Sequence, residues 1–197
     1  MKRMSLRKVS LSLIPVFGLV LLVPSLQARP KLSPKQQQAV TEAVGTLTSF
    51  STLREGLAST LEGQEEVTIE DFRRVCAPIG QQVRAWAEEK GYQAKQVSTR
   101  YRNPNNKASE EEARELAWLK ANPNLKMQAR PGQIKVNEEM ISGVHLYVPI
   151  RVASSCLHCH GAQDSRPEFV RQNYPEDKAH GFKTGDLRGM YSVFIKD

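Results

Sequence analysis

The pattern of apolar residues predicts helices in the first half of the chain and strands in the second half. Leucine and valine recur at helical spacing between Ser33-Pro34, a typical N-cap and first helical residue, and Gly63, where we expect the helix to end. A second periodic stretch runs from Thr68 to Gly91. We therefore expect two long helices, each with one apolar face. The first could pack on its own domain or pair with a second copy of the chain in a homodimer, and the sequence leaves both open.

The second predicted helix carries a cysteine on its apolar face and a proline in its interior. Its apolar positions follow the i, i+3, i+4, i+7 rule, and Cys76 belongs to this buried stripe. Pro78 removes one backbone hydrogen bond, and its ring crowds the carbonyl group of Arg74. We therefore expect a kink beside Cys76.

Several segments beyond Gly91 mix β-branched, apolar and polar residues as half-buried strands do. A capping box of Ser109 and Glu112 begins a third predicted helix, which ends near Ala121. Residues 163–186 are rich in proline, glycine and charge and are predicted to form a long loop. Helices followed by an antiparallel sheet indicate the α+β class. The predicted strands span residues 92–99, 125–130, 133–140, 144–150 and 190–195, with Pro131-Gly132 as the turn between the second and the third.

The N-terminus has the three segments of a secretory signal peptide. Basic residues precede an apolar run at 9–23, and a small-residue exit ends at Ala28. We expect cleavage after Ala28, which leaves residues 29–197 as one domain in the bacterial periplasm. The run is too short to span a bilayer comfortably, so retention as an anchor is the second possibility. No later stretch is apolar enough to cross a membrane, and we expect no span after signal removal.

The net charge of the chain depends strongly on this signal. Residues 1–28 hold four of the 28 basic side chains and none of the 21 acidic ones, so their removal lowers the formal charge from +7 to +3. The remaining sequence has no basic stripe interleaved with aromatic residues. We therefore do not expect a nucleic acid as partner.

The segment from Cys156 to His160 matches the Cys-x-x-Cys-His motif of covalent haem attachment. The thiols of Cys156 and Cys159 would form thioether bonds with two vinyl groups of the porphyrin, and the imidazole of His160 would be the proximal iron ligand. The spacing is demanding, because two thiols must reach neighbouring pyrrole rings while the adjacent ring reaches the metal. The motif predicts haem c as the cofactor.

A Cys-x-x-Cys pair has three other common uses. A zinc site would need a second ligand pair at matching spacing, and the sequence has none. A thioredoxin-like redox pair would follow a strand and begin a helix within a βαβ unit, a pattern that this region does not show. A disulfide between Cys156 and Cys159, in a haem-free interaction domain, remains as an alternative.

Four separated segments of this chain together resemble a family of exported single-haem c-type proteins with a PAS-like fold. The resemblance covers nearly all of residues 29–197. It implies a PAS-like antiparallel sheet with N-terminal helices and a covalently bound haem c, and a role in redox or gas sensing or in electron transfer. The segments are Arg102-Asn103-Pro104, His145–Ile150, Cys156–Gly161 and Tyr174–Gly189, the last with its Gly-Asp-Leu-Arg-Gly tail.

The second axial position of the iron would determine what such a protein does. Cys76 is the leading candidate, because it is the one cysteine outside the attachment motif and lies on the apolar face of a predicted helix. The family resemblance also suggests a cysteine ligand at this position. A thiolate there would lower the midpoint potential, whereas a methionine would raise it. Arg100, Arg102 and Arg188 are candidates to pair with the haem propionates. The rival axial candidates are Met127, Met140, His145 and His180.

We therefore expect a haem protein, not an enzyme, that senses redox state or a gas or transfers electrons at low potential. Its partner would be a redox protein or a small gaseous ligand. A haem peroxidase-like enzyme is the alternative from another class. That chemistry needs an open iron position with a distal histidine and arginine, and ligation by Cys76 would block it.

Overall fold

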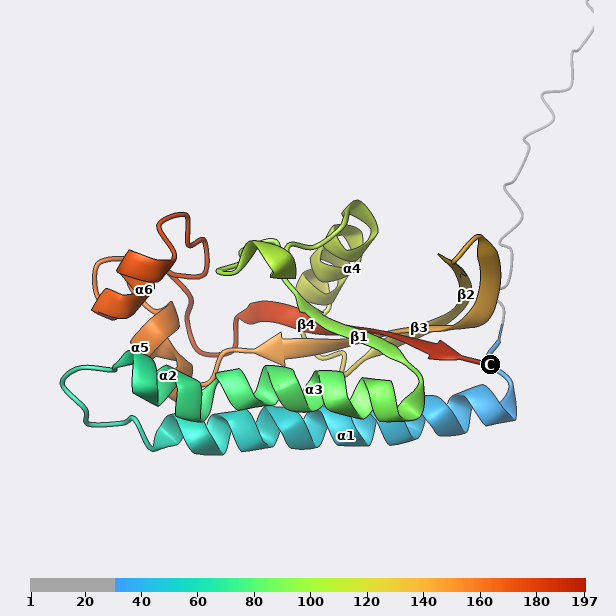
Figure 1. Cartoon of the computed structure of the whole chain (residues 1–197), viewed down its shortest axis with the longest axis horizontal. Helices are drawn as coiled ribbons and strands as arrows, with labels where there is room; N and C mark the ends of the chain where they lie inside the picture. Colours follow the sequence, from blue (N-terminus) through green and yellow to red (C-terminus); the bar gives the residue numbers. More distant parts are fainter. Residues whose placement is uncertain (1–30) are drawn as a thin grey trace, which may run out of the picture.

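A four-stranded antiparallel sheet forms the centre of the structure, with two helices along one face and a shorter helix on the other (Figure 1). The computed structural model describes residues 31–197, so the predicted signal peptide at 1–28 lies outside the described residues. The strand order is β1-β4-β3-β2. The α+β class predicted from the sequence is confirmed. The strands are β1 (Gln93–Val97), β2 (Gln128–Val136), β3 (Glu139–Arg151) and β4 (Leu187–Lys196).

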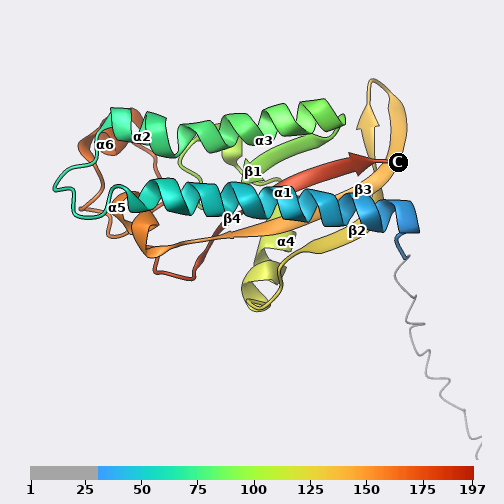
Figure 2. The same ribbon diagram turned by 90° about the horizontal axis from the view of Figure 1, so that it is seen from below.

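Helices α1 (Pro34–Ser59) and α3 (Ala77–Lys90) run side by side across one face of the sheet, as Figure 2 shows from below. Helix α4 (Glu110–Ala121) lies on the opposite face. The remaining short helices gather at one end of the sheet, and they surround the end of β3 (Figure 1). They are α2 (Ile69–Val75), α5 (Leu157–His160) and α6 (Glu168–Asn173), and the 3-10 turns are η1 (Pro104–Asn106) and η2 (Ser154–Cys156).

Capping interactions begin the helices where the sequence predicts. Ser33 accepts a hydrogen bond from the Gln36 backbone N–H, and the Gln36 side chain accepts one from the Ser33 N–H. Ser109 and Glu112 form the same pair of bonds at the start of α4. Each box satisfies backbone donors that have no partner inside the helix. At the other end α1 stops at Ser59, before the predicted end at Gly63.

The predicted kink beside Cys76 is confirmed and is a full break. Cys76 separates α2 from α3, and Pro78 lies in the first turn of α3. A proline in this turn costs little, because the first N–H groups of a helix have no intrahelical acceptor. The Cys76 N–H still donates to the Phe72 carbonyl at 2.9 Å, so the chain remains connected by hydrogen bonds through the break.

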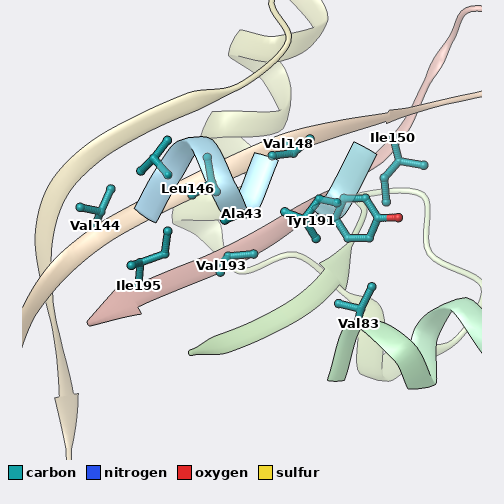
Figure 3. Close-up of a cluster of buried hydrophobic side chains, with 11 residues drawn as sticks. Ala43, Val83, Val144, Leu146, Val148, Ile150, Tyr191, Val193 and Ile195 are labelled. Atoms are coloured by element: carbon teal, nitrogen blue, oxygen red, sulfur yellow. The ribbon is translucent and has the colours of Figure 1, made fainter. Parts of the chain in front are cut away.

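The main core lies between the sheet and the α1–α3 pair (Figure 3). Alternate residues of β3 from Val144 to Ile150 point toward the helices, as their period-two pattern predicts. Ala43 and Leu47 of α1 and Val83 of α3 are buried against them. Each fully buried side chain of valine or leucine size contributes about 1.5–3 kcal/mol. The apolar face of α1 is therefore covered by the sheet of its own chain.

The turn predicted at Pro131-Gly132 is wrong, because both residues lie inside the continuous strand β2. Strand β2 is at the edge of the sheet, where a proline without an N–H group is tolerated. Gly132 also leaves room for the His145 ring: a Cβ atom at this position would lie 2.3 Å from Cδ2 of His145, so a larger residue would force that ring to move. The hairpin turns instead at Asn137 and Glu138, whose φ angles are +48° and +71°. These values suit the type I′ turn of a two-residue hairpin.

The loop predicted at 163–186 contains the helix α6, so this prediction is wrong in part. Helix α6 has six residues and no side-chain cap, which leaves little local signal for it. Its Phe169 and Val170 are buried against Val75 and Leu61. Long-range packing therefore defines this helix. Across residues 31–197, no helix has the length and apolar character that a membrane crossing requires.

Replacing Glu138 with glycine is expected to stabilise the fold by about 0.5–1 kcal/mol, because glycine adopts a positive φ without the Cβ penalty. The change removes the ion pair between Lys135 and Glu138, but both side chains are exposed, so that loss is small. Urea unfolding measures the change. Glu139→Gly, at the neighbouring strand position, is the control and should destabilise; equal effects of the two substitutions would contradict the turn assignment.

Candidate cofactor site

A cavity of about 720 Å³ is lined by residues of α1, α3, β1 and the end of β3, and by residues of the short helices that follow β3. Its lining includes Cys76, Cys156, Cys159 and His160, so the structure brings together all four site residues predicted from the sequence. Cys76 reaches it from the break between α2 and α3, and the other three come from η2 and α5 directly after β3. The volume lies within the range of about 300–1,000 Å³ that cofactor pockets occupy.

The turn that carries the Cys-x-x-Cys-His motif is held by backbone hydrogen bonds. Val152, just beyond β3, donates to Asp186 and accepts from Gly185, at 3.0 and 2.8 Å. Gly161 closes the turn by donating to the Leu157 carbonyl at 2.8 Å. A Cβ atom at Gly161 would lie 2.6 Å from that carbonyl oxygen. Glycine is therefore required immediately after the motif.

The imidazole of His160 is oriented by the C-terminal segment. Its Nδ1 lies 2.6 Å from the Ala179 carbonyl oxygen, which can only accept, so Nδ1 carries the proton. Nε2 is then left as an unprotonated nitrogen able to bind a metal, the arrangement that second-shell carbonyls impose on metal-binding histidines. Burial, together with the positive charges of Arg188 and Arg102, holds the pKa of His160 well below its ordinary value, so the ring is neutral.

A buried ion-pair cluster ties this segment to the motif. Arg102 donates to the Cys159 carbonyl oxygen at 2.5 Å, and its Nε lies 3.3 Å from Asp177 Oδ1. Arg166 pairs with the other carboxylate oxygen at 3.1 Å, and the Ala179 N–H donates to Oδ1 at 2.8 Å. Burial opposes ionisation of Asp177, but the Ala179 N–H and the two guanidinium groups lower its pKa below the ordinary value. Asp177 and Arg166 were missed by sequence reasoning, because no local pattern marks a contact across so many residues.

The thiols of the site are close enough to influence one another. All three cysteines are free, and Cys76 and Cys159 pack against the same apolar cluster. Burial raises the pKa of Cys76, and it raises the pKa of Cys159 to about 11. A charge on Cys76 or Cys156 would raise the pKa of Cys159 further. Among residues 31–197, no three histidine, cysteine or acidic side chains are arranged to hold a metal ion by themselves.

Cationic side chains line another part of the cavity. Arg54 of α1 donates to the Tyr191 hydroxyl at 2.7 Å, and Arg188 of β4 donates to the Arg100 carbonyl at 3.0 Å. Burial, then the charge of Arg102, lowers the pKa of Arg188 to about 10. Within the described part of the chain, neither Arg54 nor Arg188 has a carboxylate within salt-bridge distance. The cavity therefore offers guanidinium groups to an anionic ligand.

The rival axial candidates lie elsewhere. Met127 packs against the core under α1, and Met140 is 59 % exposed at the β2–β3 hairpin. The ring of His145 stacks on Tyr147 and meets Phe194 edge-on, away from the cavity. His180 is partly buried but does not line the cavity. Of the five candidates, the structure brings only Cys76 to the wall of this cavity.

Asp177→Asn is expected to destabilise the protein by about 3 kcal/mol at neutral pH, because it leaves two buried guanidinium groups without a carboxylate. The pKa of Asp177 is lowered in the folded state, so its stabilising contribution is present above about pH 4 and is lost as the pH falls below that value. The wild type and the Asp177→Asn variant should therefore differ less in their free energy of unfolding at acidic pH, as measured by urea unfolding. Glu176→Gln, at an exposed neighbouring position, is the matched control. If the stability difference between the wild type and Asp177→Asn did not depend on pH, Asp177 would not be the ionised partner of Arg102 and Arg166.

Comparisons with known proteins place the chain in a family. The model of the Tll0287-like family matches residues 31–196. A solved structure described as the crystal structure of the cyanobacterial heme-protein Tll0287 is 40 % identical in sequence, covering 84 % of this chain and 98 % of that chain with a TM-score of 0.67. A search of curated proteins found no match. The match over nearly all described residues shows that this chain belongs to the Tll0287-like family.

Proposed function

We propose that this chain is a periplasmic haem c protein with a PAS-like fold that works by redox change at the iron. Cys156 and Cys159 would carry the thioether bonds, and His160 would be the proximal ligand. The observation that carries the proposal is the position of the motif: its two thiols and an imidazole with a free Nε2 line one cavity of cofactor size. The related protein described as a heme-protein supports it.

The residues present fit this cofactor in three respects. The cavity of about 720 Å³ has room for a large planar group. Its apolar wall, which includes Phe72, Leu61 and Val148, suits a porphyrin ring. Arg102 and Arg188, two of the three predicted partners, line the cavity with Arg54 and suit the two propionates, because the guanidinium fork matches carboxylate geometry. The third predicted partner, Arg100, does not line this cavity.

Bound haem would supply a one-electron change between ferric and ferrous iron. The chain determines how readily that change occurs. The Ala179 carbonyl keeps the proton on Nδ1 of His160, which makes Nε2 a better electron donor. Arg102 holds the Cys159 carbonyl against Asp177, and this fixes the turn that carries Cys159 and His160.

We further propose Cys76 as the second axial ligand. It lies at the junction of two helices, so a change at its sulfur is transmitted directly to α2 and α3. A Cys76 thiolate stabilises the ferric state and lowers the midpoint potential. The potential then suits low-energy electron transfer or redox sensing, with a redox protein or a small gas as partner.

The helix break supports the sensing version of this proposal. Loss of the Cys76 bond on reduction would free the hinge between α2 and α3, and Pro78 keeps that hinge from closing into a continuous helix. A gas could then take the position that Cys76 leaves. Electron transfer needs no such movement, so a structural change at the hinge that follows the redox state separates the two versions.

An enzymatic role of the peroxidase class is less well supported. His145, the histidine on the strand leading to the motif, stacks on Tyr147 outside the cavity. The described residues therefore place no second histidine on the cavity wall to act as a distal acid and base. Hydrogen peroxide turnover by the matured protein at rates typical of enzymes, above about 1 s⁻¹, would contradict the non-enzymatic proposal.

Protein matured in a host with haem-attachment machinery is expected to be coloured, and its mass should exceed that of the bare chain by one haem. A pyridine haemochrome spectrum identifies thioether-bound haem. Cys156→Ala combined with Cys159→Ala should abolish the covalent bond, because no thiol of the motif remains. A colourless wild-type protein of bare-chain mass would refute haem attachment.

Cys76→Ala is expected to shift the ferric Soret band and to raise the midpoint potential by on the order of 100 mV, because an anionic ligand of ferric iron is removed. Absorption spectra and redox titration measure both effects. Met140→Ala is the matched control, since Met140 lies on the exposed hairpin. Unchanged spectra and potential in the Cys76 variant would show that another group binds the iron.

A further inference from the structure

A second cavity, of about 470 Å³, lies between α4 and the chain segment 182–188 that leads into β4. We refer to it as the α4 groove. Its lining contains four cationic side chains, from Arg100, Lys120, Arg151 and Arg188. Asp186 is the one acidic residue of the lining, and its carboxylate already accepts a hydrogen bond from the Lys183 N–H at 2.8 Å. The groove is therefore strongly positive.

The cations of the α4 groove are held in place by neutral groups. Arg151 donates to the Pro123 carbonyl at 2.7 Å, and the guanidinium of Arg100 lies 3.8 Å from the centre of the Phe182 ring. Among the described residues, the one hydrogen bond that Arg188 donates is to the Arg100 carbonyl, at 3.0 Å. Within residues 31–197, none of the four forms a salt bridge. Carbonyl and ring contacts position these cations but do not neutralise them, so an anion would be bound favourably.

The other wall of the α4 groove is apolar. Leu116 of α4 is buried, and Ala113 and Ala117 lie on the same side of the groove. The buried ring of Phe182 lies beneath Arg100. A fully polar ion such as phosphate would leave this wall uncovered. The lining suits a ligand with one anionic end and an apolar body.

We propose that the α4 groove binds a small organic carboxylate with an apolar body. We also propose that this binding lowers the midpoint potential of iron held by His160. The carboxylate would lie among Arg100, Lys120 and Arg151, and the apolar body would lie against Leu116. The binding claim is independent of haem, whereas the claim of coupling rests on the proposed function.

Two residues connect the groove to His160. The Phe182 ring stands edge-on to the His160 imidazole, with centroids 6.2 Å apart and planes at 89°, and Arg100 covers this same ring. Arg188 lines both the groove and the larger cavity. An anion beside these guanidiniums offsets positive charge near the axial histidine. Ferric iron, which carries one more positive charge than ferrous iron, is then stabilised, and the midpoint potential falls.

Binding is tested by calorimetric titration of the matured, haem-loaded protein with benzoate. We expect saturable binding with a dissociation constant of about 1 mM or tighter. Benzyl alcohol lacks the charge and inorganic phosphate lacks the apolar body, so both should bind at least several-fold more weakly. Equal binding of either compound, or absence of benzoate binding, would overturn the proposed site.

Variants locate the binding within the groove. Arg100→Gln should weaken benzoate binding about tenfold, because it removes a charge-assisted hydrogen bond. Lys120→Gln should weaken benzoate binding several-fold. Lys120 is exposed, so this substitution leaves the fold intact. Lys90→Gln, exposed at the end of α3 and outside both cavities, is the charge-matched control and should bind as the wild type does. Unchanged affinity in the Arg100 and Lys120 variants would place the benzoate elsewhere and refute the site.

Redox titration with and without benzoate tests the coupling. Saturating benzoate should lower the midpoint potential of the wild type and of Lys90→Gln, and should have little effect on Arg100→Gln. Binding without a change in potential would overturn the coupling while leaving the site. A colourless protein would overturn the proposed function and the coupling together, whereas its calorimetric titration would still decide whether the groove binds carboxylates.

Discussion

The hydrogen bond from His160 to the Ala179 carbonyl is the interaction on which the site depends. It determines which ring nitrogen is available, and it requires that the segment carrying Ala179 be held against the motif. Buried Asp177 provides this, because its carboxylate binds the Ala179 N–H, Arg102 and Arg166 together. Arg102 in turn holds the Cys159 carbonyl. A carboxylate two residues before Ala179 thus determines the chemistry of an imidazole that it does not touch.

The helical side of the site is built on a different constraint. A continuous helix through Cys76 would place this residue as one more member of an apolar stripe. Pro78 prevents that continuity, and the chain resumes as α3 packed on the sheet through Val83. Cys76 is left at the break, on the wall of the cavity that the attachment motif also lines. The same sheet therefore supports both sides of the site, through α3 and through the end of β3.

Local signals in the sequence predicted much of this arrangement. Capping residues, period-two alternation and Pro78 each act within one turn or strand, so the helix starts, β3 and the break at Cys76 followed from them. The turn at Pro131-Gly132 failed because proline and glycine also suit an edge strand beside a bulky His145 ring. Helix α6 and the role of Asp177 depend on contacts between distant segments. The α4 groove likewise forms between α4 and residues 182–188, which are distant in sequence, so no local pattern predicts it.

The distribution of charge connects the two cavities. Desolvating a guanidinium without a carboxylate is costly, yet half-buried Arg54 and Arg188 line the larger cavity without one, and the exposed Arg100 lines the α4 groove, also without one. Asp177, the buried carboxylate of this region, is already shared by Arg102 and Arg166. The cost is offset if anions arrive as ligands: haem propionates in one cavity and an organic carboxylate in the other. Because Arg188 lines both, an anion bound in either cavity would change the electrostatic free energy of anion binding in the other, and linkage would make that effect reciprocal.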